Sequence, residues 1–195
     1  MIKYGWAVLP SWLLVAACSA RTSELPKLAE PQELFWATLQ GLCGRAFAGT
    51  VREAPPSDTT FANQELIMHV RQCRDDEISI PFHVGTNRSR TWIVSRTGAG
   101  LRLKHDHRHE DGSEDAITQY GGDTRSVGTD GRQEFSADTH TASLIPAAAT
   151  NVWTIEVRAA DSFTYALRRE GTDRRFRIEF DLTRDVSTPP APWGH

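Results

Sequence analysis

Three histidines alternate with other residues near the middle of the chain and form its densest group of candidate metal ligands. They are His105, His107 and His109. If this run is a β-strand, their imidazoles project from one face about 7 Å apart. Imidazoles bind Zn, Cu or Ni, and Asp111 or Glu114 from the adjoining turn can complete the ligand set. The alternative is a hydrogen-bonded polar network without metal.

The residues before the histidines indicate where the same face points. Leu101 and Leu103 share the parity of the histidines and are expected to face the core. The strand then runs from an apolar interior towards a polar end, which places the histidines at the mouth of a cavity. By contrast, His69 and His83 have the polar parity of their strands, so we expect them at the surface.

Aromatic residues on several predicted strands are candidates for lining a ligand pocket. The four selected are Trp92, Tyr120, Trp153 and Tyr165. The alternative is that they form ordinary core, since aromatic residues at strand spacing often do.

No recognisable catalytic motif accompanies these residues. The sequence lacks Gly-x-Ser-x-Gly, Gly-x-Gly-x-x-Gly, the P-loop and His-Glu-x-x-His. We therefore assign no catalytic residue and favour a protein that is not an enzyme.

The chain has three cysteines, of which two are expected to pair with each other and the third to have a separate role. Cys43 and Cys73 are expected to form a disulfide, because paired cysteines are usual in an oxidising, secreted compartment. Closing a loop of about 31 residues stabilises a protein by roughly 3–4 kcal/mol in the chain-entropy model. No Cys-x-x-Cys motif suggests a redox site.

The third cysteine, Cys18, follows a segment that is typical of a signal peptide. Residues 4–17 are uncharged and mostly apolar, and they are too few to span a bilayer as a helix, which takes about 20. Residues 14–18 resemble the bacterial lipobox, which implies cleavage after residue 17 and lipidation of Cys18. Ser19 rather than Asp after the cysteine favours the periplasmic face of the outer membrane. The alternative is an ordinary secretory signal and a secreted protein.

The remaining elements are predicted from periodicity. Apolar residues at helical spacing after Pro31 predict one helix that stops near Gly44. Beyond it apolar residues alternate with polar ones, as in half-buried antiparallel strands. The nine or ten expected strands lie around residues 47–52, 66–70, 78–84, 90–97, 101–109, 116–120, 133–135, 153–157, 163–167 and 176–182. Residues 137–150 interrupt the pattern and are expected to be a short helix or a loop.

These elements predict an all-β fold: an antiparallel, up-and-down, calycin-like barrel of about 8–10 strands with one N-terminal helix. The expected organisation is a signal peptide (1–17), a lipidated tether (18–31), a β-barrel domain (32–184) and a flexible Pro-rich tail (185–195). The 195 residues suit one such domain, and 39% hydrophobic residues are typical of a soluble globular body. A formal charge of −3 shows no excess of basic residues of the kind that nucleic-acid-binding proteins have.

Two parts of the sequence resemble a family of uncharacterised secreted bacterial proteins, lipoproteins among them. They are residues 35–49 (FWATLQGLCGRAFAG) and 103–112 (LKHDHRHEDG), with residues 119–122 (QYGG) beyond. That resemblance implies the compartment and a single domain, and no activity. More loosely, a helix leading into a first strand and an antiparallel meander is similar to lipocalin and fatty-acid-binding-like barrels. The Gly-x-Trp of lipocalins is replaced by residues 44–46 (GRA), with Ala46 where Trp would stand.

We therefore expect a lipid-anchored protein of the bacterial cell envelope that binds a small apolar or amphipathic molecule in its barrel. The alternatives are a metal-handling lipoprotein that uses the three histidines, an envelope enzyme and a protein-interaction module. The expected partners are the membrane, through the lipid, and a small-molecule ligand. Zn, Cu or Ni is the only cofactor considered.

Overall fold

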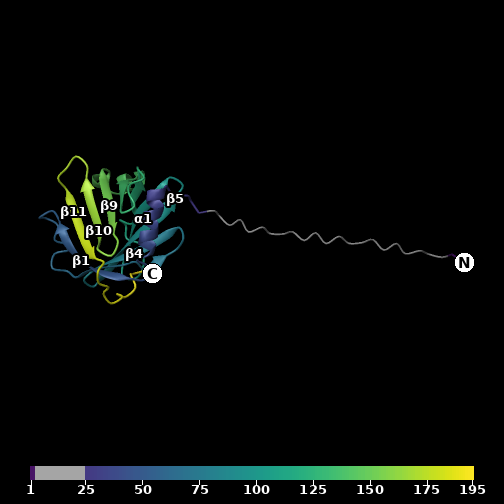
Figure 1. Cartoon of the computed structure of the whole chain (residues 1–195), viewed down its shortest axis with the longest axis horizontal. Coiled ribbons are helices and arrows are strands. Elements are labelled where there is room, and N and C mark those ends of the chain that lie inside the picture. The colour runs from purple at the N-terminus through teal and green to yellow at the C-terminus, as the bar shows by residue number, and fades with distance from the viewer. Residues whose placement is uncertain (3–24) are drawn as a thin grey trace.

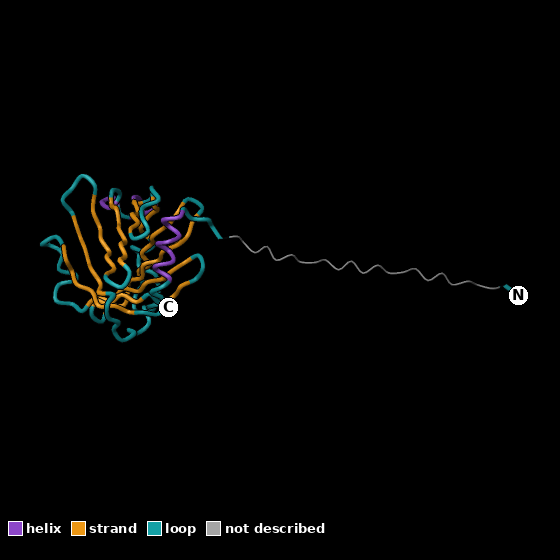
Figure 2. Tube along the Cα trace, in the orientation of Figure 1, coloured by secondary structure: helices purple, strands orange, loops and turns teal. Residues whose placement is uncertain are grey.

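Ten β-strands close into an antiparallel barrel around one interior (Figures 1 and 2). The structure is a computed structural model, and it describes residues 1–2 and 25–195. The strands are β1 (Ala46–Glu53), β2 (Leu66–His69), β3 (Gln72–Cys73), β4 (Glu77–Val84), β5 (Asn87–Thr97), β6 (Gly100–His107), β7 (Tyr120–Thr124), β8 (Arg132–Ala137), β9 (Asn151–Arg158), β10 (Ser162–Arg169) and β11 (Arg175–Asp181). Neighbouring strands follow the order β2-β1-β11-β10-β9-β8-β7-β6-β5-β4, and β2 pairs with β4 to close the ring. The two-residue β3 pairs with the start of β4 outside the ring.

The alternation of side chains along the strands produces the barrel interior, which confirms the predicted all-β barrel. On β11, Phe176, Ile178 and Phe180 are buried, whereas Arg177 and Glu179 are partly exposed on the outer face. Closing the sheet leaves no long unpaired strand edge among the ten barrel strands.

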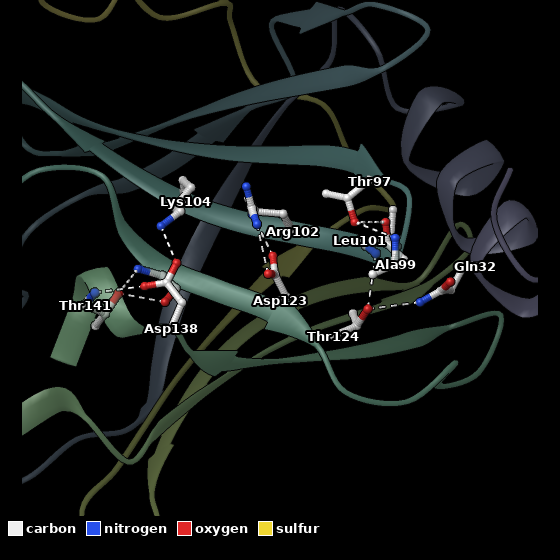
Figure 3. Close-up of polar contacts among 12 residues, drawn as sticks. Gln32, Thr97, Ala99, Leu101, Arg102, Lys104, Asp123, Thr124, Asp138 and Thr141 are labelled. Atoms are coloured by element: carbon white, nitrogen blue, oxygen red, sulfur yellow. Dashed lines mark hydrogen bonds and ion pairs between the residues drawn. The ribbon is translucent and has the colours of Figure 1, made fainter. Parts of the chain in front are cut away.

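Helix α1 (Glu30–Gln40) lies across one end of the barrel. Its first turn meets β7, where the amide Nε2 of Gln32 donates to Thr124 Oγ1 at 3.1 Å (Figure 3). Just after the helix, Gly44 N donates to Val70 O beyond the end of β2. Phe35, Trp36 and Leu39, between these anchors, are fully buried in the core. The helix therefore closes this end of the barrel, and a binding site is to be sought at the opposite end, which the helix does not cover.

A disulfide between Cys43 and Cys73 ties the turn after α1 to β3, as predicted. The two Cα atoms are 6.2 Å apart, and 30 residues separate the cysteines in the sequence. The bond fastens the closing helix to the wall of the barrel.

The strand predicted at residues 116–120 was placed wrongly. The strand β7 begins at Tyr120 and continues through Gly121 and Gly122, although a pair of glycines is typical of a turn. A Cβ on Gly121 would lie 2.0 Å from Leu103 O, and one on Gly122 would lie 1.7 Å from Ser136 O. The glycines therefore allow β7 to pack closely between β6 and β8.

The predicted end of the strand at His109 is wrong, whereas the short helix or loop expected at residues 137–150 is present. The strand predicted to reach His109 ends at His107, because the chain turns after it and Arg108 bridges Glu114. Residues 137–150 contain both a helix and a loop: α2 (Thr139–Leu144), capped by the Asp138 carboxylate on Thr141 N at 2.8 Å, and the 3-10 turn η1 (Pro146–Ala148).

His69 and His83 are buried, which contradicts their predicted place at the surface. Their exposed fractions are 5% and 4%. They lie on β2 and β4, and the C-terminal segment crosses the outer wall here: Val186 N donates to Ala46 O on β1. Further along, Trp193 N donates to Arg88 O on β5.

The C-terminal segment, expected to be a flexible tail, also contacts β6. His195 Nε2 and the Asp106 carboxylate are 2.8 Å apart, and the Asp106 side chain is only 1% exposed. At the other end of the chain, the predicted lipid-acceptor Cys18 and all of the signal peptide beyond Ile2 lie outside the described residues. No helix in the described ranges is long and apolar enough to cross a bilayer.

Candidate functional site

A cavity of about 330 Å³ opens at the end of the barrel opposite α1. It lies between the first residues of β5, β7 and β9 and the last residues of β6 and β10. Its aromatic lining consists of Phe61, Phe82, Trp92, Tyr120, Trp153, Tyr165 and Phe176. Its polar lining consists of Asp58, Thr60, Arg90, His105, His107, Asn151, Arg169 and Arg174. A largely apolar pocket with a few converging polar groups is typical of a small-molecule site.

The floor of the cavity is a stack of aromatic rings from opposite walls. The ring of Trp92 on β5 lies 4.3 Å from that of Tyr165 on β10 and 4.9 Å from that of Phe82 on β4, both nearly parallel to it. All four aromatic residues selected from the sequence, which include Tyr120 and Trp153, line this one cavity. Whether they bind a ligand stays a prediction.

His105 is held in one orientation at the base of the cavity. Its Nδ1 lies 3.1 Å from Tyr120 O, and its Nε2 lies 2.7 Å from the Tyr165 hydroxyl. A carbonyl oxygen can only accept, so Nδ1 carries the proton and the Tyr165 hydroxyl donates to Nε2. Burial lowers the pKa of His105 to about 3, so the ring is neutral at pH 7.

His107 lies one step nearer the mouth and is paired with Tyr120. Its Nε2 and the Tyr120 hydroxyl are hydrogen-bonded at 3.2 Å. Burial, and secondarily the charge of Arg90, lower the pKa of His107 to about 4. Burial raises the pKa of Tyr120 to about 12. Both groups are neutral at pH 7, so they act as hydrogen-bonding groups in the wall.

Arg90 is the charged group on this side of the cavity. Its Nη1 donates to Asn87 Oδ1 at 2.9 Å and, more weakly, to Ser89 Oγ at 3.4 Å. Burial lowers the pKa of Arg90, though a guanidinium stays charged at pH 7. Among the residues that the structure describes, no carboxylate lies within 4.0 Å of it, so its charge is not neutralised by an ion pair.

The rim opposite Arg90 is also cationic. Arg169 Nε donates to Asn151 Oδ1 at 3.0 Å, and Arg174 lies 3.8 Å from the carboxylate of Asp58. The lining thus holds three arginines against one aspartate. This excess of positive charge favours the binding of an anionic ligand.

The loop between β1 and β2 reaches over the mouth through Phe61. The Phe61 ring lies 4.9 Å from that of Phe176 and 5.8 Å from that of Phe82, and Arg90 Cζ is 6.0 Å from its centroid. The side chain is partly exposed. Phe61 therefore forms an apolar edge of the entrance.

The structure does not bring the predicted metal ligands together. His105 and His107 line the cavity, whereas His109 and Asp111 are exposed in the turn after β6. Asp111 Oδ1 there accepts from Ser113 N and Oγ. Within residues 25–195, no three His, Cys, Asp or Glu side chains form a group that could hold a metal ion. Metal binding stays a prediction that no contact here favours.

Arg90, Arg169 and Phe61 were missed from the sequence. Arg90 shares the parity of Trp92, and Arg169 that of Tyr165, so alternation alone indicates the cavity face. The missing information was which strand ends meet at the open end. Phe61 lies in a loop, where no periodicity could have indicated it.

Comparison of the chain with protein-family models, with curated proteins and with solved structures yields no match in any of the three.

Proposed function

We propose that this chain is a lipid-anchored protein of the bacterial cell envelope whose barrel binds a small amphipathic molecule in the cavity opposite α1. The observation that carries the ligand part is the cavity itself. Seven aromatic rings surround it, and its polar groups are confined to a few positions in the wall and at the rim. Such a lining accepts an apolar body and orients it by few hydrogen bonds.

The lipid anchor is inferred from the sequence. Residues 14–18 have the lipobox pattern, and an apolar segment precedes them. Leu28 is packed in the core and α1 begins at Glu30, so residues 19–27 are the chain that would let the barrel stand off a membrane surface. A chain tethered in this way would hold its ligand at the periplasmic face of the outer membrane.

The ligand part is tested with a neutral, apolar fluorescent probe, N-phenyl-1-naphthylamine, on the chain without its signal peptide. Leu167 lines the cavity, so the larger indole of Leu167→Trp takes up part of the space that a ligand would occupy. Ile117 is 48% exposed, so Ile117→Trp adds the same ring elsewhere. We expect saturable binding to the wild type and to Ile117→Trp, and at least about tenfold weaker binding to Leu167→Trp. Equal binding to all three proteins would contradict a cavity site.

The anchor is tested in a bacterial host by metabolic labelling with a fatty acid and by detergent-phase partition. We expect the wild type to take up label and enter the detergent phase, and Cys18→Ser to do neither. An unlabelled wild-type protein found in the aqueous phase would show that the protein is secreted without lipid.

A further inference from the structure

We propose that the cavity takes an organic acid, with a flat apolar body against the aromatic floor and a carboxylate held by the guanidinium of Arg90. This inference rests on the proposed function, because it names the chemical class of the ligand for the same cavity.

Among the described residues, Arg90 lacks the carboxylate partner that other arginines of the barrel have. Arg96 lies 2.7 Å from a carboxylate oxygen of Glu33, and Arg102 lies 2.6 Å from one of Asp123. Arg90, in a partly buried position, has only the neutral oxygens of Asn87 and Ser89. A partly desolvated cation without a counter-ion is costly, and an anion entering the cavity would offset that cost.

The guanidinium of Arg90 keeps two nitrogen donors for a ligand. Asn87 and Ser89 engage only Nη1 of Arg90, and within the described chain Nε and Nη2 make no hydrogen bond. These two nitrogens form the side edge of the guanidinium. Arg45 uses the same edge to hold both oxygens of Asp185 at 2.7–3.1 Å. A planar carboxylate fits such an edge with two parallel hydrogen bonds. Asn87 is then a positioning residue, because it fixes the guanidinium from behind.

The guanidinium of Arg90 and the aromatic floor lie a short distance apart along β5. Arg90 and Trp92 lie on the same face of β5, two residues apart, so their Cα atoms are about 7 Å apart. Trp92 is buried and stacked between Phe82 and Tyr165, and the three rings together line the cavity on the side away from its mouth. A compact acid with a fused aromatic ring is long enough to reach from the guanidinium of Arg90 to the rings at Trp92.

The side chains around Arg90 that line the cavity are mostly neutral or cationic. His107 is neutral at pH 7, since burial and Arg90 lower its pKa to about 4, and Tyr120 is a neutral phenol. Asp58 is the one carboxylate in the lining, and Arg174 lies 3.8 Å from it. The three arginines of the lining outnumber this one carboxylate, so the cavity favours an anion at Arg90, whereas a cationic ligand would meet Arg90 and Arg169.

The test compares three probes of one shape by isothermal titration calorimetry at pH 7: 2-naphthoate, neutral 2-naphthamide and cationic 2-naphthylmethylammonium. The proteins are the wild type, Arg90→Gln and Arg74→Gln. Arg74 is 67% exposed and pairs with Glu77, so its variant loses the same charge away from the cavity. We expect the wild type and Arg74→Gln to bind the acid about tenfold to a hundredfold more tightly than the amide, and the ammonium most weakly. In Arg90→Gln the acid should bind no better than the amide.

Equal binding of acid and amide to the wild type, or a preference for the acid that survives in Arg90→Gln, would overturn the carboxylate assignment while leaving a neutral-ligand cavity. The order of the three probes on the wild type decides the proposal even if Arg90→Gln does not fold. If neither these probes nor N-phenyl-1-naphthylamine binds, the proposed function itself fails.

Discussion

Both ring nitrogens of His105 are hydrogen-bonded inside the protein, and this decides what the residue does. The ring, on β6, bridges the backbone of the neighbouring strand β7 and the hydroxyl of Tyr165 on β10. It also stacks on Tyr120 with ring centroids 4.5 Å apart. His105 therefore fixes the floor of the cavity, whereas Arg90, with donors to spare, faces whatever enters.

We predict that His105→Ala lowers the free energy of unfolding by about 2–4 kcal/mol, because it leaves a void and an unpaired Tyr165 hydroxyl. Urea denaturation measures the loss. His109→Ala, at an exposed position two residues further on, should change the stability by less than about 0.5 kcal/mol. A similar loss in both variants would contradict the structural role given to His105.

Among the elements, β7 shows most clearly how close packing is built from residue type. Two consecutive glycines let it pair with β6 on one side and β8 on the other, with the backbones almost in contact. Tyr120 at its start then reaches the cavity. Looser packing of β7 would move Tyr120 and weaken its hydrogen bond to His107 and its stacking on His105.

We expect Gly122→Ala to cost more than about 3 kcal/mol or to prevent folding, because the new Cβ would lie 1.7 Å from a backbone oxygen. Gly98→Ala is the matched control: its Cβ would meet nothing within 4 Å, so the variant should lie within about 1 kcal/mol of the wild type. Thermal unfolding followed by circular dichroism compares the two. A Gly122→Ala protein as stable as Gly98→Ala would contradict this packing.

The elements also show what the sequence could and could not predict. Apolar and polar residues alternate along the sequence of β9–β11, and the apolar face was predicted correctly, as at Ile155, Phe163 and Ile178. Burial itself alternates cleanly only on β11, because Thr154 and Thr164 are buried as well. The glycine pair in β7 has the composition of a turn, and only the neighbouring backbones reveal its place in a strand. His69 and His83 have surface parity, but a segment more than 100 residues away in sequence covers the wall beside them. Parity assigns a face, and it does not predict what lies on that face.

At the scale of the whole molecule, several histidines are buried in a neutral form. Burial lowers the pKa of His83 and of His107 from 6.5 to about 4, and that of His105 to about 3; the pKa of His69 is lowered as well. The unfolded chain therefore binds more protons than the folded one below pH 6.5. Stability must fall as the pH drops through this range, by up to about 1.4 kcal/mol per pH unit for each such histidine.

We predict that the free energy of unfolding decreases from pH 7 to pH 5, a window that lies above the ordinary pKa of carboxylates. His83→Gln should reduce the slope of the unfolding free energy against pH by the equivalent of about one bound proton. His140→Gln, at an exposed position, should leave this slope unchanged. Urea titrations at a series of pH values give the slopes. A stability that is flat over this window would contradict the buried, neutral histidines.

The central claim is that the open end of the barrel holds a small organic acid. Native mass spectrometry of the protein purified from its own host tests it most directly, with Leu167→Trp prepared in parallel. The account predicts that the wild type carries one additional small molecule, identified as an acid after release, and that Leu167→Trp carries none. A wild-type protein found only at its unliganded mass, or carrying the same molecule as Leu167→Trp, would contradict it.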